Sequence, residues 1–307
     1  MGISLFIAGL IGGPLVIIVF LSLRTFRRSS CAFYLTIMSV VNFAQLFTGL
    51  FSYIMLYGFS IDWSNLSLLY CKCRLFSVQS NSLISFTCLC LATIDQFLAT
   101  CSHPRWHQYN NITFARYMVI GTIIFWISHG IPFILYYNHT LSSVTNTPIC
   151  MITNTIFYRY FYSFYLPVLT SILPITIMII FGVLSYRNIQ RIDHRTIPLV
   201  RRELDKQLTV MVLVQVFYAV LALTPQLIYS YYSLITGTST DQFTLILIQS
   251  IRNIITMFYY TYFMSSLYIY TSVSKRFRQQ LIYVLFTLHY NRWSLLKRRN
   301  NRIEPQA

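Results

Sequence analysis

Residues Cys71 to Pro104 read CKCRLFSVQSNSLISFTCLCLATIDQFLATCSHP, and this segment is the most informative part of the chain about its fold. Between Leu75 and Ile94 it carries no charged residue. At a rise of about 1.5 Å per residue, an uncharged run of this length crosses the hydrocarbon core of a bilayer, about 30 Å thick, as one helix. The stretch therefore predicts a membrane-spanning helix with Cys71 at one membrane face and Asp95 near the other.

The composition excludes a soluble protein. Of 307 residues, 56% are hydrophobic and only 10% are charged, whereas about 25% of a typical soluble domain is charged. No basic segment or small-residue cleavage site marks the first apolar run as a removed signal peptide, so we expect a membrane helix there and no separate N-terminal ligand-binding domain. The runs long enough to span a bilayer predict helices at 3–23, 32–58, 70–101, 113–136, 156–186, 205–234 and 242–271.

The net charge of +16 suggests nucleic-acid binding, but the positions of the basic residues argue against it. All but four of the 23 lysines and arginines lie in alternate connections between the spans or after the last span. Cytoplasmic loops of membrane proteins carry such an excess. The pattern predicts an outer N-terminus, a cytoplasmic C-terminus and seven spans. The four exceptions are Lys72, Arg74, Arg159 and Arg252.

The run from Cys71 to Asp95-Gln96-Phe97 resembles the third transmembrane helix of rhodopsin-like (class A) G-protein-coupled receptors, whose inner end usually reads Asp-Arg-Tyr. Asp95 matches, and Gln96 and Phe97 differ. The resemblance implies a divergent receptor of the plasma membrane that binds an extracellular ligand and activates a heterotrimeric G protein. It implies an all-α membrane protein, a seven-transmembrane helix bundle with a short amphipathic helix after the seventh span. Further matches, several of them degraded, are Gly12, Gly13, Leu15, Asn42, Trp126, Pro174, Pro225, Tyr270 and Phe277.

The chain divides into two parts on this interpretation. Residues 1–272 form a single receptor domain, and residues 273–307 form the amphipathic helix and a basic cytoplasmic tail. Between Val273 and Trp293 the apolar positions alternate with basic and amide residues and are too few to span a bilayer. We therefore expect this helix to lie on the inner surface and to contact membrane lipids.

A disulfide from Cys150 to the top of the third span is what the resemblance implies. Cys71 and Cys73 are both placed to form it, and the spacing to Asp95 favours Cys71. Sequence alone leaves the connectivity open.

Three Asn-x-Ser/Thr sequences occur in predicted loops. Asn65 and Asn138 lie on the outer side, where a glycan can be attached, whereas Asn111 lies on the inner side and should stay unmodified.

The resemblance also assigns a switch at the inner membrane face. In the family, the arginine of the third span pairs with an acidic residue at the base of the sixth. Asp205 supplies that acid, but Gln96 is neutral and offers only an uncharged hydrogen bond, which is about half as strong. We expect a weaker lock and more ligand-independent signalling. The residues assigned to switching and G-protein coupling are Asp95, Gln96, Phe97, Asp205, Pro225 and Tyr270.

Metal, cofactor and catalytic sites are not expected. Asn42 replaces an aspartate that binds sodium in the family, and a neutral amide cannot offset the dehydration of a cation; we expect an interhelical hydrogen bond instead. His103 and His107 have metal-ligand spacing but lack a third ligand. No nucleophile with a base and no phosphate-binding glycine loop is visible, so an enzyme is not predicted.

The expected ligand is a short, neuropeptide-like peptide. Val78 stands where amine receptors have an aspartate, which disfavours amines. Arg252 is the one cationic anchor expected at the bundle mouth, where it could bind a carboxylate or extend toward lipid headgroups. A lipid carboxylate also fits, and a transporter or channel is the alternative class, although the spans lack intramembrane charges. The candidate ligand-binding residues are Val78, Gln79, Ser82, Gln226, Tyr229, Arg252, Thr256 and Tyr260.

Overall fold

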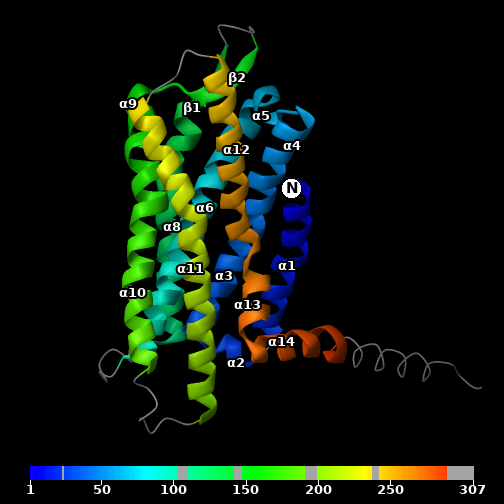
Figure 1. Cartoon of the computed structure of the whole chain (residues 1–307), viewed down its shortest axis with the longest axis vertical. Helices are drawn as coiled ribbons and strands as arrows, with labels where there is room; N and C mark the ends of the chain where they lie inside the picture. The colour runs from blue at the N-terminus through cyan, green and yellow to red at the C-terminus, as the bar shows by residue number, and fades with distance from the viewer. Residues whose placement is uncertain (23, 102–109, 142–146, 191–198, 237–241, 289–307) are drawn as a thin grey trace, which may run out of the picture.

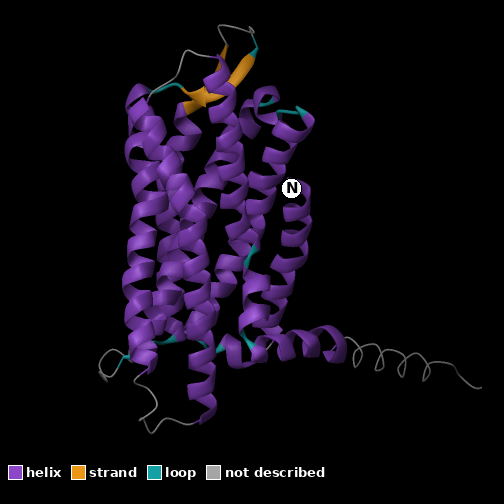
Figure 2. Ribbon diagram, in the orientation of Figure 1, coloured by secondary structure: helices purple, strands orange, loops and turns teal. Residues whose placement is uncertain are grey.

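Long helices lie side by side in an elongated bundle, with a short β-hairpin at one end and a helix lying across the other (Figures 1 and 2). The structure is a computed structural model that describes residues 1–22, 24–101, 110–141, 147–190, 199–236 and 242–288. Asp205 lies within a described helix, but its side chain is outside the described part, as are His103 and His107. The elements connect in the alternating up-and-down order that short loops impose on a bundle.

Within the residues that the structure describes, six helical segments are long and apolar enough to cross a membrane. The ends of these segments agree with those of the first six predicted spans to within a few residues. The exception is the sixth segment, which begins at Leu199, earlier than the predicted start at residue 205. The segments are α1 (Gly2–Ser22); α3 (Ser30–Gln45) with η1 (Leu46–Phe51) and α4 (Ser52–Phe59); α6 (Leu68–Thr100); α8 (Ile112–Tyr136); α9 (Thr155–Tyr160) with η2 (Phe161–Ile172) and α10 (Leu173–Gln190); and α11 (Leu199–Thr236).

The seventh predicted span is formed by two helices, α12 (Gln242–Met264) and α13 (Ser266–Val273). They break at Ser265, whose N–H donates to Tyr262 O (3.3 Å), a tighter turn than the α-helical one. The two helices together cover the predicted range 242–271, with one interruption that the sequence did not indicate. This pair contacts α1 and α11 within the bundle, and its crossing of the membrane stays a prediction.

Helix starts follow from local capping chemistry. Ser29 precedes α3 and accepts from Ala32 N, Ser67 precedes α6 and accepts from Tyr70 N, and Asn111 precedes α8 and accepts from Thr113 N. A side-chain oxygen at this position satisfies one of the N–H groups that the first helical turn leaves without a partner.

Helix α6 is the centre of the bundle. It contacts α3, α8, α10 and α11, and most of its residues from Ser80 to Thr100 are buried. This explains why the run without charges is so long: a helix surrounded by other helices has few positions that can face water or headgroups. The small residues along α6 allow its neighbours to approach closely.

Gly130 marks the closest approach of α8 to α6. A Cβ atom at this position would lie 2.6 Å from the Phe76 ring and 2.7 Å from Ser80 Oγ. We expect Gly130→Ala to lower the free energy of unfolding by about 1–3 kcal/mol, since overpacking forces side chains or backbone to shift. Gly121→Ala in the same helix is the control, because a Cβ there meets nothing within 4 Å. Equal thermal unfolding midpoints for the two purified variants would show that α6 and α8 are not in this close contact.

The segment after α13 turns across the end of the bundle (Figure 1). It consists of α14 (Lys275–Ile282) and η4 (Tyr283–Leu288). Phe277 is fully buried against Phe20 and Tyr270, with ring centroids 5.8 and 5.6 Å away. Lys275 and Ile282, by contrast, are exposed. The predicted short amphipathic helix after the last helix of the bundle is confirmed; its contact with lipid stays a prediction.

Candidate ligand and signalling sites

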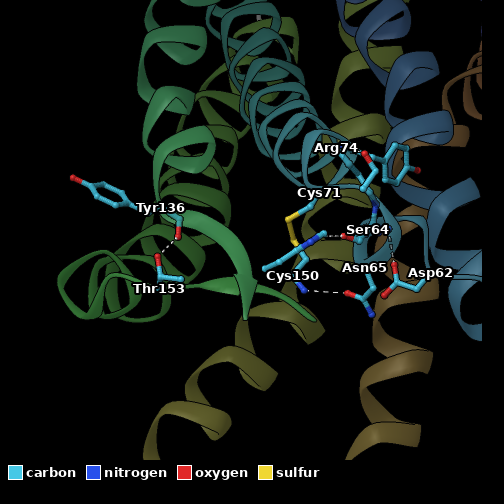
Figure 3. Close-up of a disulfide and its surroundings, with 11 residues drawn as sticks. Asp62, Ser64, Asn65, Cys71, Arg74, Tyr136, Cys150 and Thr153 are labelled. Carbon is cyan, nitrogen blue, oxygen red and sulfur yellow. Dashed lines mark hydrogen bonds between the residues drawn. A yellow bond between two sulfur atoms is a disulfide. The ribbon is translucent and has the colours of Figure 1, made fainter. Parts of the chain in front are cut away.

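A disulfide joins the hairpin to the end of the central helix (Figure 3). Cys71 in α6 bonds to Cys150 in β2 (Pro148–Ile152), with Cα atoms 6.0 Å apart. Strand β2 pairs antiparallel with β1 (Tyr137–Leu141). Cys73 is a free, exposed thiol, so the pairing favoured by the spacing is confirmed.

One side chain and one main-chain carbonyl of the short helix α5 (Trp63–Leu66) fix the hairpin further (Figure 3). Cys150 N donates to Asn65 Oδ1 (3.0 Å), and His139 Nε2 donates to Ser64 O (2.7 Å). Burial raises the pKa of Tyr137 at the start of β1, so its phenol stays neutral at physiological pH. The hairpin is thus held over the α6 end of the bundle at several points. The two predicted glycosylation sites lie in this region, Asn65 in α5 and Asn138 in β1, and their modification stays a prediction.

Arg74 is a basic residue of the bundle mouth whose role the sequence did not indicate. It lies three residues after Cys71 on α6 and is half-buried. Its Nε donates to Thr48 O in η1 (3.3 Å) and its Nη1 donates to Ser64 Oγ (3.1 Å). It also interacts electrostatically with Tyr260 of α12. The expectation of a single cationic anchor was therefore incomplete, because only folding brings Thr48, Ser64 and Tyr260 to Arg74.

Arg252 is exposed on α12 and lies within electrostatic range of tyrosines from two different helices. Tyr53 belongs to α4 in the second segment of the bundle, and Tyr162 belongs to η2 in the fifth. Tyr229 of α11 also interacts with Tyr162. The neighbouring Asn253 accepts from Tyr53 Oη of α4, so this part of α12 packs against the second segment of the bundle.

Aromatic residues of α4 and α12 form a connected cluster. Tyr53 Oη donates to Asn253 Oδ1 (2.6 Å), and the rings of Tyr53 and Tyr260 are 6.1 Å apart. Tyr260 in turn contacts Tyr259 at 5.6 Å. Thr256, a further predicted ligand-binding residue, lies on the same helix and is half-buried.

Ser82 is buried in a polar cluster that joins three helices. Its hydroxyl accepts from Gln45 Nε2 of α3 and from Tyr259 Oη of α12, both at 3.1 Å, and donates to Val78 O at 2.8 Å. With these partners in place, Ser82 has little hydrogen-bonding capacity left for a ligand. It forms the base of the outer half of the bundle and ties α3, α6 and α12 together.

The remaining predicted ligand-binding residues face several parts of the bundle. Val78 and Gln79 are half-buried on α6, and Gln79 O accepts from Tyr165 Oη of η2 (3.4 Å). Gln226 and Tyr229 are half-buried on α11, after Pro225. Their contact with a ligand stays a prediction.

Deeper in the bundle, Asn42 bridges two helices as expected. Its Oδ1 accepts from Ser85 Oγ of α6 (2.5 Å), and Tyr262 Oη lies 3.2 Å from the same hydroxyl. The interhelical hydrogen bond predicted for Asn42 is confirmed, whereas the lack of a sodium site stays a prediction. A cavity of about 10 Å³ beside it has room for about one water molecule. It is lined by Gly12, Gly13, Val16, Ser39, Asn42, Phe263, Met264, Ser266 and Leu267.

Near the end of α6 opposite the disulfide, Asp95 is buried and only 5% exposed. The hydroxyl of Ser30, the first residue of α3, lies 2.8 Å from each of its carboxylate oxygens. Asn110 Oδ1 lies 2.8 Å from the same hydroxyl. Asp95 thereby links the inner ends of α3 and α6.

Gln96 joins α6 to α11. Its Oε1 accepts from Thr209 Oγ1 at 2.6 Å, and both residues are almost fully buried. Thr209 follows Asp205 by one helical turn on α11, so it lies on about the same face of that helix. The expected contact between Gln96 and the sixth span therefore exists, and the partner that the structure shows is Thr209. The proposed pairing with Asp205 lies outside the described residues.

Aromatic contacts surround this inner site. Phe97 packs edge-on against Phe181 of α10 at 5.5 Å. Tyr270 of α13 is fully buried between Phe20 and Phe277, with ring centroids 5.8 and 5.6 Å away. Phe97 thus joins α6 to α10, and Tyr270 joins α13 to α1 and α14.

A protein-family model described as "7 transmembrane receptor (rhodopsin family)" matches residues 12–268. The match covers most of the chain and includes α6, the hairpin and the start of α13. This chain therefore belongs to the rhodopsin family of seven-transmembrane receptors, the class A G-protein-coupled receptors, which are multi-pass membrane proteins. No curated protein matches the sequence.

Proposed function

We propose that this receptor binds a short peptide at the hairpin end of the bundle through a carboxylate of the peptide, and that binding activates a heterotrimeric G protein at the α14 end. The hairpin then faces outside the cell, and the C-terminal end faces the cytoplasm.

The position of Arg252 carries this proposal. It is exposed on α12, next to Asn253, which accepts from Tyr53 Oη of α4 at 2.6 Å, and a guanidinium forms paired, charge-assisted hydrogen bonds with a carboxylate. Val78 on α6 supplies no acid for an amine. The aromatic cluster of Tyr53, Tyr259 and Tyr260 offers large, rigid contact surfaces that suit aromatic or apolar peptide side chains.

G-protein activation is supported by the family and by the inner site. Family members share an extracellular ligand and a G-protein partner, and the hydrogen bond from Thr209 to Gln96 is a contact between α6 and α11 that a movement of α11 would break. A transporter has no comparable support from the family.

Arg252→Gln should lower the affinity for acidic peptides at least about tenfold, because it removes a charge-assisted bond. We would screen C-terminally free and amidated peptides, with an amine library alongside, by nucleotide exchange on a panel of G proteins. Arg159→Gln is a matched loss of an outer positive charge and should have little effect. Activation by amines, or equal potency of free and amidated peptides, would contradict the proposal.

A further inference from the structure

The outer half of the bundle has more basic than acidic residues. Lys72, Arg74, Arg159 and Arg252 stand against Asp62 and Asp241. Asp241 lies outside the described residues, and Asp62 is used locally: its Oδ1 accepts from Ser64 N and so caps α5. The described part of the mouth thus offers cations without matching carboxylates.

Arg74 is the less exposed of the two arginines at the mouth. Its two hydrogen bonds go to neutral acceptors, Thr48 O and Ser64 Oγ. A guanidinium has five N–H donors in a rigid plane, so its Nη2 group remains without an acceptor among the described residues. Arg74 is half-buried, and none of its nitrogens is among the described buried atoms that lack a partner. The Nη2 group therefore reaches solvent, where an anionic ligand group can form a charge-assisted hydrogen bond with it.

The two arginines lie at different ends of one pair of tyrosines. Arg74 Nε donates to Thr48 O, and Tyr260 Oη lies close to the neighbouring Gly49. Tyr53 Oη donates to Asn253, the residue after Arg252, and the rings of Tyr53 and Tyr260 are 6.1 Å apart. A single carboxylate beside Arg252 would leave Arg74 unpaired. Two anionic groups separated by an apolar or aromatic spacer would satisfy both arginines and cover the tyrosines between them.

We infer that the ligand of this receptor carries two anionic groups, one bound by Arg252 and the other by Arg74, with an apolar or aromatic segment between them over Tyr53 and Tyr260. The inference rests on the proposed function in that it places the ligand at the same mouth. Two carboxylates can come from a peptide, as an acidic side chain and the C-terminus, or from a fatty dicarboxylic acid.

The test uses the full-length receptor in lipid nanodiscs and measures affinity by surface plasmon resonance. One set of probes is peptides of three to five residues with a carboxylate at each end and phenylalanine between, each with single-amide and double-amide versions. The second set is dodecanedioic acid with dodecanoic acid as its single-acid match. The variants are Arg74→Gln, Arg74→Lys and Arg252→Gln, and Lys72→Gln is the control because Lys72 is a neighbouring cation on the same helix.

Diacids should bind wild-type receptor at least about tenfold more tightly than their single-acid matches. Arg74→Gln should remove this preference, Arg74→Lys should keep part of it, and Lys72→Gln should leave it unchanged. The loss of affinity caused by amidating one carboxylate of the ligand and the loss caused by Arg74→Gln should not add, because both changes remove the same contact. Diacid and single-acid probes are compared on the same receptor variant, so the result holds even if Arg74→Gln also lowers the stability of the receptor.

The outcomes separate the two claims. If single-acid peptides bind as well as diacids and Arg74→Gln changes nothing, the two-anion inference is wrong and the peptide receptor stands. If only the fatty diacid binds, and through Arg74, the inference stands and the peptide proposal is wrong. If no diacid of either kind binds wild-type receptor more tightly than its single-acid match, the inference is overturned.

Discussion

Replacing Cys150 with serine is expected to lower the free energy of unfolding by about 4 kcal/mol and to remove most receptor from the cell surface. The disulfide to Cys71 closes a loop with a sequence separation of 79, and cross-linking a loop of this length restricts the unfolded chain by about that amount. The bond also holds the hairpin against α5, where Asn65 accepts from the Cys150 backbone. Thermal unfolding of purified receptor and antibody staining of intact cells would measure the two effects.

The matched control is Cys73→Ser. Cys73 lies two residues from Cys71 on the same helix but is exposed and free, so its replacement should leave both measurements unchanged. Cys71→Ser should resemble Cys150→Ser, and the double variant should be no worse than either single one, because each breaks the same bond. A Cys150→Ser protein with wild-type stability would mean that the hairpin is held without the disulfide.

Thr209→Val is expected to raise ligand-independent nucleotide exchange by about five- to 150-fold. The substitution keeps the shape of the side chain and removes the hydroxyl that donates to Gln96 Oε1 at 2.6 Å. Both side chains are almost fully buried, so the glutamine oxygen loses its partner without gaining water. A buried acceptor left in this way costs about 1–3 kcal/mol, which sets the expected range. The cost falls on the arrangement in which α6 and α11 meet, and therefore favours arrangements in which they separate.

Thr209→Ser keeps the hydroxyl and is the control, with exchange expected near the wild-type level. A spin-label distance between the inner ends of α6 and α11 gives a second measurement that needs no G protein, and it should lengthen in Thr209→Val alone. If Thr209→Val shows neither increased exchange nor a longer distance while remaining folded, the Gln96–Thr209 bond does not hold the two helices together in the unliganded receptor.

The membrane-embedded bundle could be predicted from the amino-acid sequence alone. Apolar runs are local features, and a bilayer requires that backbone hydrogen bonds be made within each segment, so the first six spans could be placed within a few residues. The run from Leu75 to Ile94 lacks charge because α6 is surrounded by other helices. The break at Ser265 could not be predicted, since its residues also suit a continuous helix.

Which polar groups contact one another depends on how the helices pack, and the sequence did not predict it. Ser30 pairs with Asp95 over 65 positions, and Gln96 pairs with Thr209 over 113; no periodicity in the sequence links such positions. Arg74 and Lys72 are both basic residues two positions apart near the start of α6, and the sequence does not distinguish their roles. Packing nevertheless brings Thr48, Ser64 and Tyr260 around Arg74. Hydrophobicity acts along each segment and so fixes which segments are buried, whereas hydrogen bonds and charges act over a few ångströms and depend on how the segments pack.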